Sequence, residues 1–217
     1  MKDKSLLHKI ALIVLILLGG IAFFWLVVVR VLAKLNGGEP CPYALAWLVD
    51  NPIRRWYMAQ ILDRIGIRPG ERVLELGPGP GAFTVEAARR IEPGGTLVAV
   101  DIQPKMVAAV EQKVREAGLT NVETHVASAY KLSLEDKSVD RAFLVTVLPE
   151  IPDRQRALAE LRRVLKPDGV LSITEEFLDP DYPLAQTTIR WAGEAGFELA
   201  ERHGNWWVYT LNFRKTV

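Results

Sequence analysis

Hydrophobic positions follow two different patterns along the 217-residue chain. From Ile10 to Val29 the side chains are all apolar, apart from two glycines, and none is charged. From Arg72 onward, short apolar runs alternate with segments whose apolar residues recur at helical spacing. The pattern predicts an N-terminal apolar helix followed by an α/β domain.

The alternation predicts five strands joined by helices. The expected strands are 72–76, 96–101, 122–126, 139–147 and 170–175. The expected helices are 82–91, 104–117, 153–165 and 185–195. Because most of these strands are apolar on both faces, we expect a parallel sheet covered by helices on both sides, in a doubly wound α/β arrangement.

The C-terminal segment has a different pattern. Two strand-like runs, "FELAERH" and "WWVYTLNF", flank the pair Gly204-Asn205. Such a pair between alternating segments is typical of a tight turn. We expect the sheet to end in an antiparallel hairpin.

The N-terminal apolar run has the length of a membrane span. Twenty helical residues cover roughly 30 Å, the thickness of the hydrocarbon core of a bilayer. A cleaved signal peptide has a shorter apolar region, of about 7–15 residues. We therefore predict an uncleaved membrane anchor in residues 1–35, with a helix lying in one leaflet as the alternative. Basic residues flank both ends, so orientation rests on the need for a cytosolic cosubstrate, which places the domain at the cytoplasmic face.

Residues 36–70 separate this run from the predicted domain at 71–217. A Gly- and Pro-rich linker, 36–42, precedes a stretch in which Trp47, Trp56 and Tyr57 are mixed with aliphatic residues and the pair Arg54-Arg55. Aromatic and basic residues together suit a membrane interface, and helices that pack on the main domain have the same composition. Both interpretations remain open.

Charge and composition exclude several classes of function. Lys and Arg number 27 against 26 Asp and Glu, so we expect no nucleic-acid partner. The single cysteine, Cys41, cannot form an internal disulfide. His125 and His203 have no Cys or carboxylate partners at metal-binding spacing, so we expect no metal.

The stretch "ELGPGPGA" joins the first predicted strand to a helix. Three glycines, Gly77, Gly79 and Gly81, would bring bare backbone close to a ligand. With Asp101 downstream, the stretch also satisfies a dinucleotide fingerprint. However, Glu75 places a carboxylate where a pyrophosphate would bind, and two prolines reduce the number of N–H donors. Both features favour a ligand that carries an amino group or a positive charge.

These residues resemble the class I S-adenosylmethionine-dependent methyltransferases. The resemblance runs from about Arg68 to Val217 and is most specific in "ELGPGPG", "AVDIQPKMV" and "LRRVLKPDGVLSI". It implies a Rossmann-like seven-stranded sheet with a C-terminal hairpin and S-adenosylmethionine as cofactor. The glycine loop would lie beside the methionine portion, Asp101 would bind the ribose hydroxyls, and Ile102 would flank adenine. The implied cofactor-binding residues are Glu75, Gly77, Pro78, Gly79, Gly81, Asp101, Ile102, Ser128, Ala129 and Thr146.

The chain departs from the family at two positions that matter for chemistry. Ser128 stands where relatives often carry an aspartate beside adenine. Thr146 and Pro149 replace an acid and a histidine, so no histidine base is expected there. Glu150 and Tyr43 are the weak catalytic candidates, and two further carboxylates on the acceptor side are Glu175 and Glu176.

Three functions follow as hypotheses. The first is a membrane-anchored methyltransferase whose acceptor is a lipid or another apolar molecule, such as an aminophospholipid head group or an isoprenoid quinone ring. Tethering at a bilayer would raise the effective concentration of such acceptors. The second is an NAD(P)-dependent oxidoreductase, and the third is a catalytically inactive cofactor-binding membrane module.

Overall fold

A single seven-stranded sheet forms the centre of the molecule. The computed structural model describes residues 2–31 and 40–216. The strand order is β3-β2-β1-β4-β5-β7-β6, in which β1 to β5 are parallel and β7 is antiparallel to both of its neighbours. The predicted Rossmann-like α/β sheet with a C-terminal hairpin is therefore confirmed. The strands are β1 Arg72–Leu76, β2 Thr96–Asp101, β3 Val122–Val126, β4 Val139–Val145, β5 Leu165–Glu176, β6 Phe197–Gly204 and β7 Val208–Lys215.

The fifth strand is longer than its apolar pattern predicts. It begins at Leu165, which pairs with Val139, and the register then shifts so that Arg141 pairs with Val170. The "KPDG" stretch therefore lies within an irregular start of β5, whereas the sequence predicts that it only ends the preceding helix. Pairing with β4 extends β5 toward its amino end, and the hydrophobic pattern of neighbouring residues in the sequence does not indicate such pairing.

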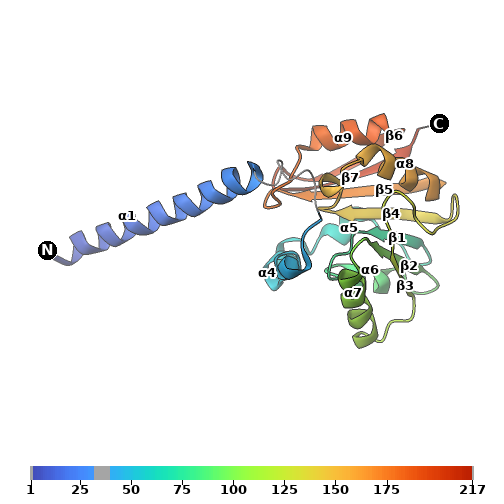
Figure 1. Ribbon diagram of the computed structural model, residues 1–217, viewed down its shortest axis with the longest axis horizontal. Helices are drawn as coiled ribbons and strands as arrows, with labels where there is room; N and C mark the ends of the chain where they lie inside the picture. Colours follow the sequence, from blue (N-terminus) through green and yellow to red (C-terminus); the bar gives the residue numbers. More distant parts are fainter. Residues whose placement is uncertain (1, 32–39, 217) are drawn as a thin grey trace.

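Helices cover both faces of the sheet, as Figure 1 shows. On one face α8 and α9 pack on the apolar side chains of β1, β4, β5 and β7. On the other face α5 and α6 pack against β1, β2 and β4, and α7 lies over β2 and β3. Apolar side chains spaced three or four residues apart form the inner stripe of each long helix. The helix bounds are α5 Ile61–Ile65, α6 Thr84–Arg90, α7 Pro104–Glu116, α8 Arg154–Val164 and α9 Ala185–Glu194.

The hairpin turn is held by one side chain. Asn205 Oδ1 accepts hydrogen bonds from the backbone N–H groups of Trp207 and Val208, at 2.8 and 3.2 Å. The two indoles therefore lie in the turn, where each contacts the ring of Phe177. The predicted hairpin is present, with a turn one residue longer than a two-residue connection.

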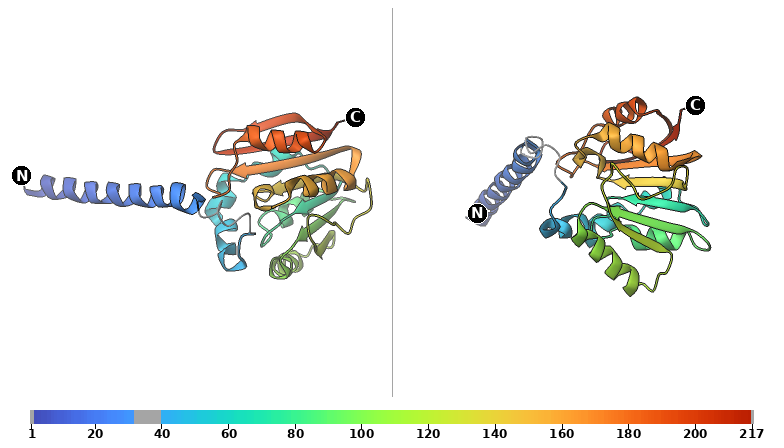
Figure 2. Two further views of the ribbon diagram at one scale, coloured as in Figure 1. Left: turned by 45° about the horizontal axis from the view of Figure 1, so that its top comes forward. Right: turned by 45° about the vertical axis from the view of Figure 1, so that its right-hand side comes forward.

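The N-terminal helix α1, Lys2–Phe23, projects away from the α/β domain (Figures 1 and 2). The regular α-helix ends at Phe23, and a π-helical segment, Phe24–Val29, follows it. The apolar run thus falls into two helical segments, and α1 includes the charged residues before Ile10. Among the described residues there is no helix with both the length and the apolar character needed to cross a membrane. The predicted membrane anchor is therefore wrong, and so is the location at the cytoplasmic face of a membrane that was derived from it.

Residues 40–57 form a chain of short helices at the end of the domain nearest α1 (Figure 2). They comprise η2 Tyr43–Leu45, α3 Ala46–Val49 and α4 Pro52–Tyr57, and we call them the lid segment. The Asn51 side chain caps α4 by accepting a hydrogen bond from the N–H of Arg54 at 2.9 Å. Most of the predicted linker lies outside the described residues.

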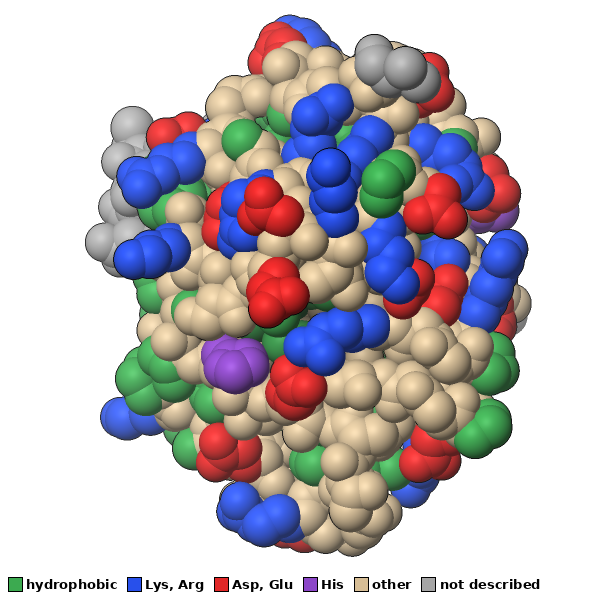
Figure 3. All heavy atoms as spheres, turned by 90° about the vertical axis from the view of Figure 1, so that its right-hand side faces the viewer, with side chains coloured by type: hydrophobic (Ala, Val, Ile, Leu, Met, Phe, Trp, Pro, Cys, Tyr) green, Lys and Arg blue, Asp and Glu red, His purple; other side chains and the backbone are tan. Residues whose placement is uncertain are grey.

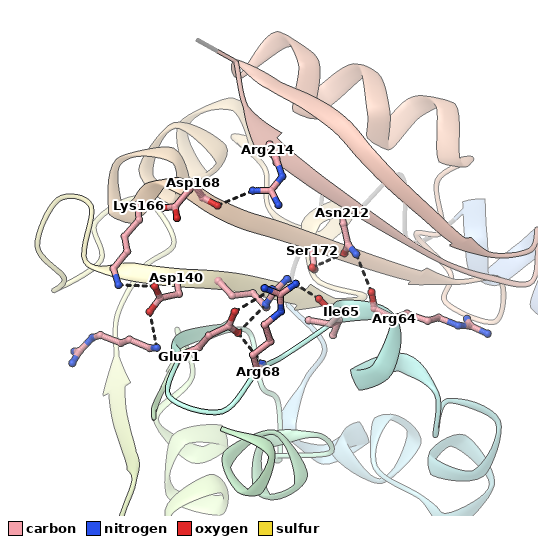
Figure 4. A network of polar contacts seen from close by, with 12 residues as sticks. Arg64, Ile65, Arg68, Glu71, Asp140, Lys166, Asp168, Ser172, Asn212 and Arg214 are labelled. Carbon is pink, nitrogen blue, oxygen red and sulfur yellow. Dashed lines mark hydrogen bonds and ion pairs between the residues drawn. The ribbon is translucent and has the colours of Figure 1, made fainter. Parts of the chain in front are cut away.

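The opposite end of the molecule carries interspersed charges. Figure 3 shows Lys and Arg side chains beside Asp and Glu over this surface. At this end of the molecule the buried Arg141 donates to both carboxylate oxygens of Glu71, at 3.1 and 3.2 Å, and to the Ile65 carbonyl at 2.7 Å. Figure 4 shows this network beside the Asp140–Lys166 ion pair. Together these contacts tie the amino ends of the strands to the chain that follows α5.

Candidate active site

A cavity of about 520 Å³ lies at the carboxyl ends of β1, β2 and β4, beneath the lid segment. Strand order reverses between β1, which continues to β2, and β4, which continues to β5. Parallel sheets bind ligands at such a reversal, because the loops diverge and leave a crevice. The volume suits a small organic ligand.

The glycine loop forms one wall of this cavity. Gly77 and Gly79 line it and have φ values of +71° and +54°. A Cβ atom on Gly77 would lie 2.6 Å from Val147 Cγ2, in the segment that follows β4. Only glycine permits both this backbone conformation and this close approach.

Glu75 faces the cavity with an unsatisfied carboxylate. Its side chain is 3 % exposed, and Oε2 has no hydrogen-bond partner among the described residues. Burial, and to a smaller extent the nearby charge of Asp101, raise the pKa of Glu75 to about 7. A buried acceptor without a partner costs free energy that a ligand bearing N–H groups or a positive charge recovers. The amino group and sulfonium of S-adenosylmethionine fit this requirement.

Asp101 connects the end of β2 to the glycine loop. Its carboxylate accepts hydrogen bonds from the N–H of Gly79 at 3.2 Å and from the N–H of Gln103 at 2.8 Å. Burial raises the pKa of Asp101, although these two bonds oppose the shift. Each oxygen keeps a free lone pair, so the carboxylate can still accept from two ribose hydroxyls.

The side of the cavity predicted to hold adenine combines apolar and polar side chains. Ile102, Ser128 and Ala129 all line it. Ser128 Oγ accepts a hydrogen bond from the N–H of Tyr130 at 3.2 Å, which leaves its hydroxyl proton for a ligand. The apolar side chain of Met106 also lines the cavity, and the sequence motifs did not identify it as a site residue.

Thr146 has a strained backbone at the cavity wall. Its φ is +56°, which is rare for a β-branched residue and is typical of functional sites. The hydroxyl donates to the Val145 carbonyl at 2.7 Å and accepts from Arg54 Nη2 at 3.3 Å. Thr146 therefore links the exit of β4 to the lid segment.

The structure does not bring every predicted residue to the cavity. Pro78 lines it, but Gly81 is not among the lining residues and packs near Val110. Tyr43 also lies outside the lining and is 43 % exposed. Glu150 lines the cavity, and burial, followed by the charge of Asp179, raises its pKa to about 8.

Arg54 is the main residue that sequence reasoning missed. It is 6 % exposed, lines the cavity and pairs through Nε with Glu176 Oε1 at 2.6 Å. Tyr57 donates a second hydrogen bond to the same carboxylate. Since 122 residues separate Arg54 from Glu176, no local signal could have indicated the pair.

Further contacts fasten the lid segment on the other side of the cavity. The Gln103 amide donates to the Cys41 carbonyl at 2.9 Å, and Lys113 on α7 pairs with Asp50. The lid segment is thus held to both halves of the sheet. In residues 2–31 and 40–216 no group of three or more His, Cys, Asp or Glu side chains could hold a metal ion.

A family model described as a methyltransferase domain matches residues 74–173. This span runs from within β1 to within β5 and includes the glycine loop, Asp101, Ser128 and Thr146. The chain therefore carries a methyltransferase domain, and this match, with the fold, supports S-adenosylmethionine as its cofactor.

Two curated relatives cover a similar part of the chain. An uncharacterized 37.1 kDa protein in transposon TN4556 of Streptomyces fradiae is 38 % identical over 139 residues, which is 63 % of this chain and 40 % of that protein. The ubiquinone/menaquinone biosynthesis C-methyltransferase UbiE of Pasteurella multocida is 33 % identical over 137 residues, which is 61 % of this chain and 51 % of that protein. The chain thus spans about half, or less, of the length of these relatives.

A solved structure has the same fold over most of the chain. The SAM-dependent methyltransferase of Aquifex aeolicus superposes with a TM-score of 0.75 at 23 % identity, covering 80 % of this chain and 98 % of that one. The structural similarity thus extends over a larger share of the chain than the similarity in sequence to the two curated relatives.

Proposed function

We propose that this chain transfers a methyl group from S-adenosylmethionine to a small acceptor with an apolar body. The observation that carries the proposal is the buried Glu75 carboxylate, whose Oε2 has no partner and which lines one cavity together with the glycine loop and Asp101. Two acidic side chains and bare backbone suit a cationic nucleoside better than an anionic dinucleotide. The same feature argues against the oxidoreductase alternative.

The cofactor, when bound, supplies a methyl group already activated by the positive sulfur. The residues of the chain then act mainly by position. Glu75 pairs with the cationic portion, Asp101 accepts from the ribose, and the lid segment keeps water from the reacting atoms. This division of labour needs neither a nucleophilic triad nor a metal.

The acceptor class follows from the lining of the cavity. Apolar side chains, among them Val49, Phe83 and Ile151, form much of the lining. We propose an apolar acceptor, with an isoprenoid quinone ring and an aminophospholipid head group as the two types to test. The printed name of the P. multocida relative supports the quinone type.

Calorimetry of cofactor binding tests the proposal. We expect S-adenosylhomocysteine to bind the protein and NADH to give no heat. Replacing Asp101 with Ala should weaken this binding by about tenfold or more, because a hydrogen bond to a charged group is worth about 1.5–3 kcal/mol. The matched control is Glu135→Gln, an exposed acid away from the cavity, and it should leave the affinity unchanged. NADH binding without S-adenosylhomocysteine binding would reject the proposal.

A further inference from the structure

Five carboxylates gather where β4 and β5 end. Glu150 lies in the short helix η3, Leu148–Glu150, and two more acids are the last residues of β5. The loop after β5 adds the remaining two. Because β4 and β5 are neighbouring parallel strands, the acids that follow them lie at the same edge of the sheet: Glu150, Glu175, Glu176, Asp179 and Asp181. We call this group the acid cluster.

Positive charge around the acid cluster is smaller than its negative charge. Arg54 is buried there, but its guanidinium already pairs with Glu176 at 2.6 Å. Arg30 lies over the ring of Phe177 at 4.6 Å and donates to the Phe177 carbonyl. Arg154 on α8 also lies near Glu150, because it donates to the Pro149 carbonyl at 2.6 Å. Three guanidinium groups against five carboxylates still leave the acid cluster with a net negative charge when its members are ionised.

The surroundings of Glu175 are a second indication that the acid cluster binds a ligand. Its side chain is fully buried, and neither carboxylate oxygen has a hydrogen-bond partner. Its neighbour Glu176, by contrast, is paired with Arg54 and Tyr57. Burying a carboxylate without a partner costs several kcal/mol, because the group loses its hydration. The same burial raises the pKa of Glu175 well above its ordinary value, and a cationic group from outside the chain would stabilise the ionised form.

The acid cluster reaches the cavity through Glu150. Glu150 is the member that lines the cavity, and the charges of Glu175 and Glu150 are coupled. Cys41, in the lid segment, lines the same cavity. The negative region therefore opens toward the side of the cavity covered by the lid segment, where an acceptor would enter.

We propose that the acid cluster binds the ammonium group of an amine methyl acceptor, and that Glu150 takes the proton which that nitrogen must lose. This inference rests on the proposed methyl transfer and narrows its acceptor to amines with an apolar body. The ammonium nitrogen passes one proton to the Glu150 carboxylate. Its lone pair then forms the new N–C bond while the S–CH₃ bond breaks, and the bonding electrons remain on sulfur as a neutral thioether. The proton on Glu150 afterwards passes to solvent.

The charge of Glu150 is suited to this role. Its pKa of about 8 lies close to the pH at which an enzyme of this kind operates. Burial and the negative charge of Asp179 raise this pKa, so the Glu150 carboxylate can take the proton from the ammonium group before passing it to solvent. Removing one member should therefore affect amine binding more than cofactor binding.

Matched probes test the inference. The probes are octylamine, 1-octanol and dihexanoyl phosphatidylethanolamine, each titrated into the protein saturated with S-adenosylhomocysteine. We expect octylamine to bind at least about tenfold more tightly than 1-octanol, since only the amine carries the positive charge. Labelled S-adenosylmethionine should methylate octylamine but not 1-octanol. If phosphatidylethanolamine is methylated faster than octylamine, the acceptor is a lipid amine. If octylamine is methylated faster, the acceptor is a free amine.

Two variants separate the acid cluster from the cofactor site. Glu150→Gln should weaken octylamine binding by about tenfold and flatten the rise of the methylation rate with pH, while S-adenosylhomocysteine binds as before. Glu175→Gln should weaken octylamine binding without removing the pH dependence, and Glu198→Gln, an exposed acid on β6, is the control. Equal affinity for octylamine and 1-octanol, no octylamine binding, or an unaffected Glu150→Gln would overturn the inference but leave the proposed methyl transfer standing. If the unmodified protein does not bind S-adenosylhomocysteine, the proposed methyl transfer itself is rejected.

Discussion

Glu75 and Asp101 come from neighbouring strands, and their carboxylates have different surroundings. Asp101 accepts two backbone hydrogen bonds, whereas one oxygen of Glu75 is buried without a partner. The satisfied group holds the glycine loop in place, and the unsatisfied group remains available to a ligand. A ligand that donates a hydrogen bond to the unpartnered oxygen of Glu75 would therefore gain binding free energy, because the cost of burying that oxygen alone would be removed.

The pKa of Glu75 makes stability depend on pH. Because burial raises this pKa from 4.5 to about 7, the folded protein holds a proton that the unfolded chain has released, so stability falls as pH rises through this range. Glu75→Gln removes the charge, and we expect the variant to gain about 2–3 kcal/mol relative to the parent between pH 5 and pH 8. Urea unfolding at both pH values, with Glu135→Gln as control, measures the difference. A gain that is the same at pH 5 and pH 8 contradicts the assignment.

At the level of elements, the site depends on two close contacts between segments of the chain. One is the contact of the glycine loop with Val147 after β4, and the other is the attachment of the lid segment through Arg54. The first sets the distance between two loops from adjacent strands. The second closes the cavity from the opposite side.

Replacing Gly77 with Ala should destabilise the protein by about 2–5 kcal/mol. The added methyl meets Val147 at 2.6 Å, and the left-handed backbone adds about 1–2 kcal/mol of strain. Gly118→Ala is the matched control, since φ there is +68° and no atom lies within 4 Å of the added Cβ. Urea unfolding should show only the backbone strain for the control, and Val147→Ala should rescue part of the Gly77→Ala loss. Equal losses for both glycine variants would exclude the close contact as the cause.

Replacing Arg54 with Met should loosen the lid segment. It leaves Glu176 buried without its cation, which costs about 3 kcal/mol. Faster hydrogen exchange in residues 46–57 and weaker S-adenosylhomocysteine binding are the expected readouts. Arg55→Met, on the same helix, removes a side chain that is 56 % exposed and should change stability by less than about 1 kcal/mol. Unchanged exchange in Arg54→Met would show that other contacts hold the segment.

At the scale of the whole molecule, charge is balanced and α1 stands apart from the α/β domain. The chain has a net charge of +1, and Figure 3 shows both signs interspersed over the end opposite α1. Nucleic-acid binding depends on a concentrated basic surface, because affinity arises from counterion release. The overall charge does not favour such a partner.

We accordingly expect no binding of a random-sequence DNA duplex tighter than about 0.1 mM at physiological salt. Fluorescence anisotropy of a labelled duplex measures this, with a basic DNA-binding domain as the positive control. Tight binding that weakens steeply with added salt would reveal a basic groove that the overall balance conceals.

Local patterning was sufficient for most of the fold. Period-two and buried runs predicted β1, β2 and β3 with the bounds that the structure has, because each is a short run delimited by turn residues. Patterning failed at the start of β5 and at the N-terminal run. Pairing with Val139 extends the strand, and the change of helix type after Phe23 divides the apolar run.

The sequence by itself determined the glycine loop, the two acids at the strand ends and the alternation that builds the sheet. These features depend on residue type and spacing, which act over a few neighbours. Only the tertiary structure decided which distant side chains meet: Arg54 with Glu176, and Lys113 with Asp50. Such contacts join residues far apart in the chain, and their energies depend on burial, which exists only once the sheet and the lid segment have come together.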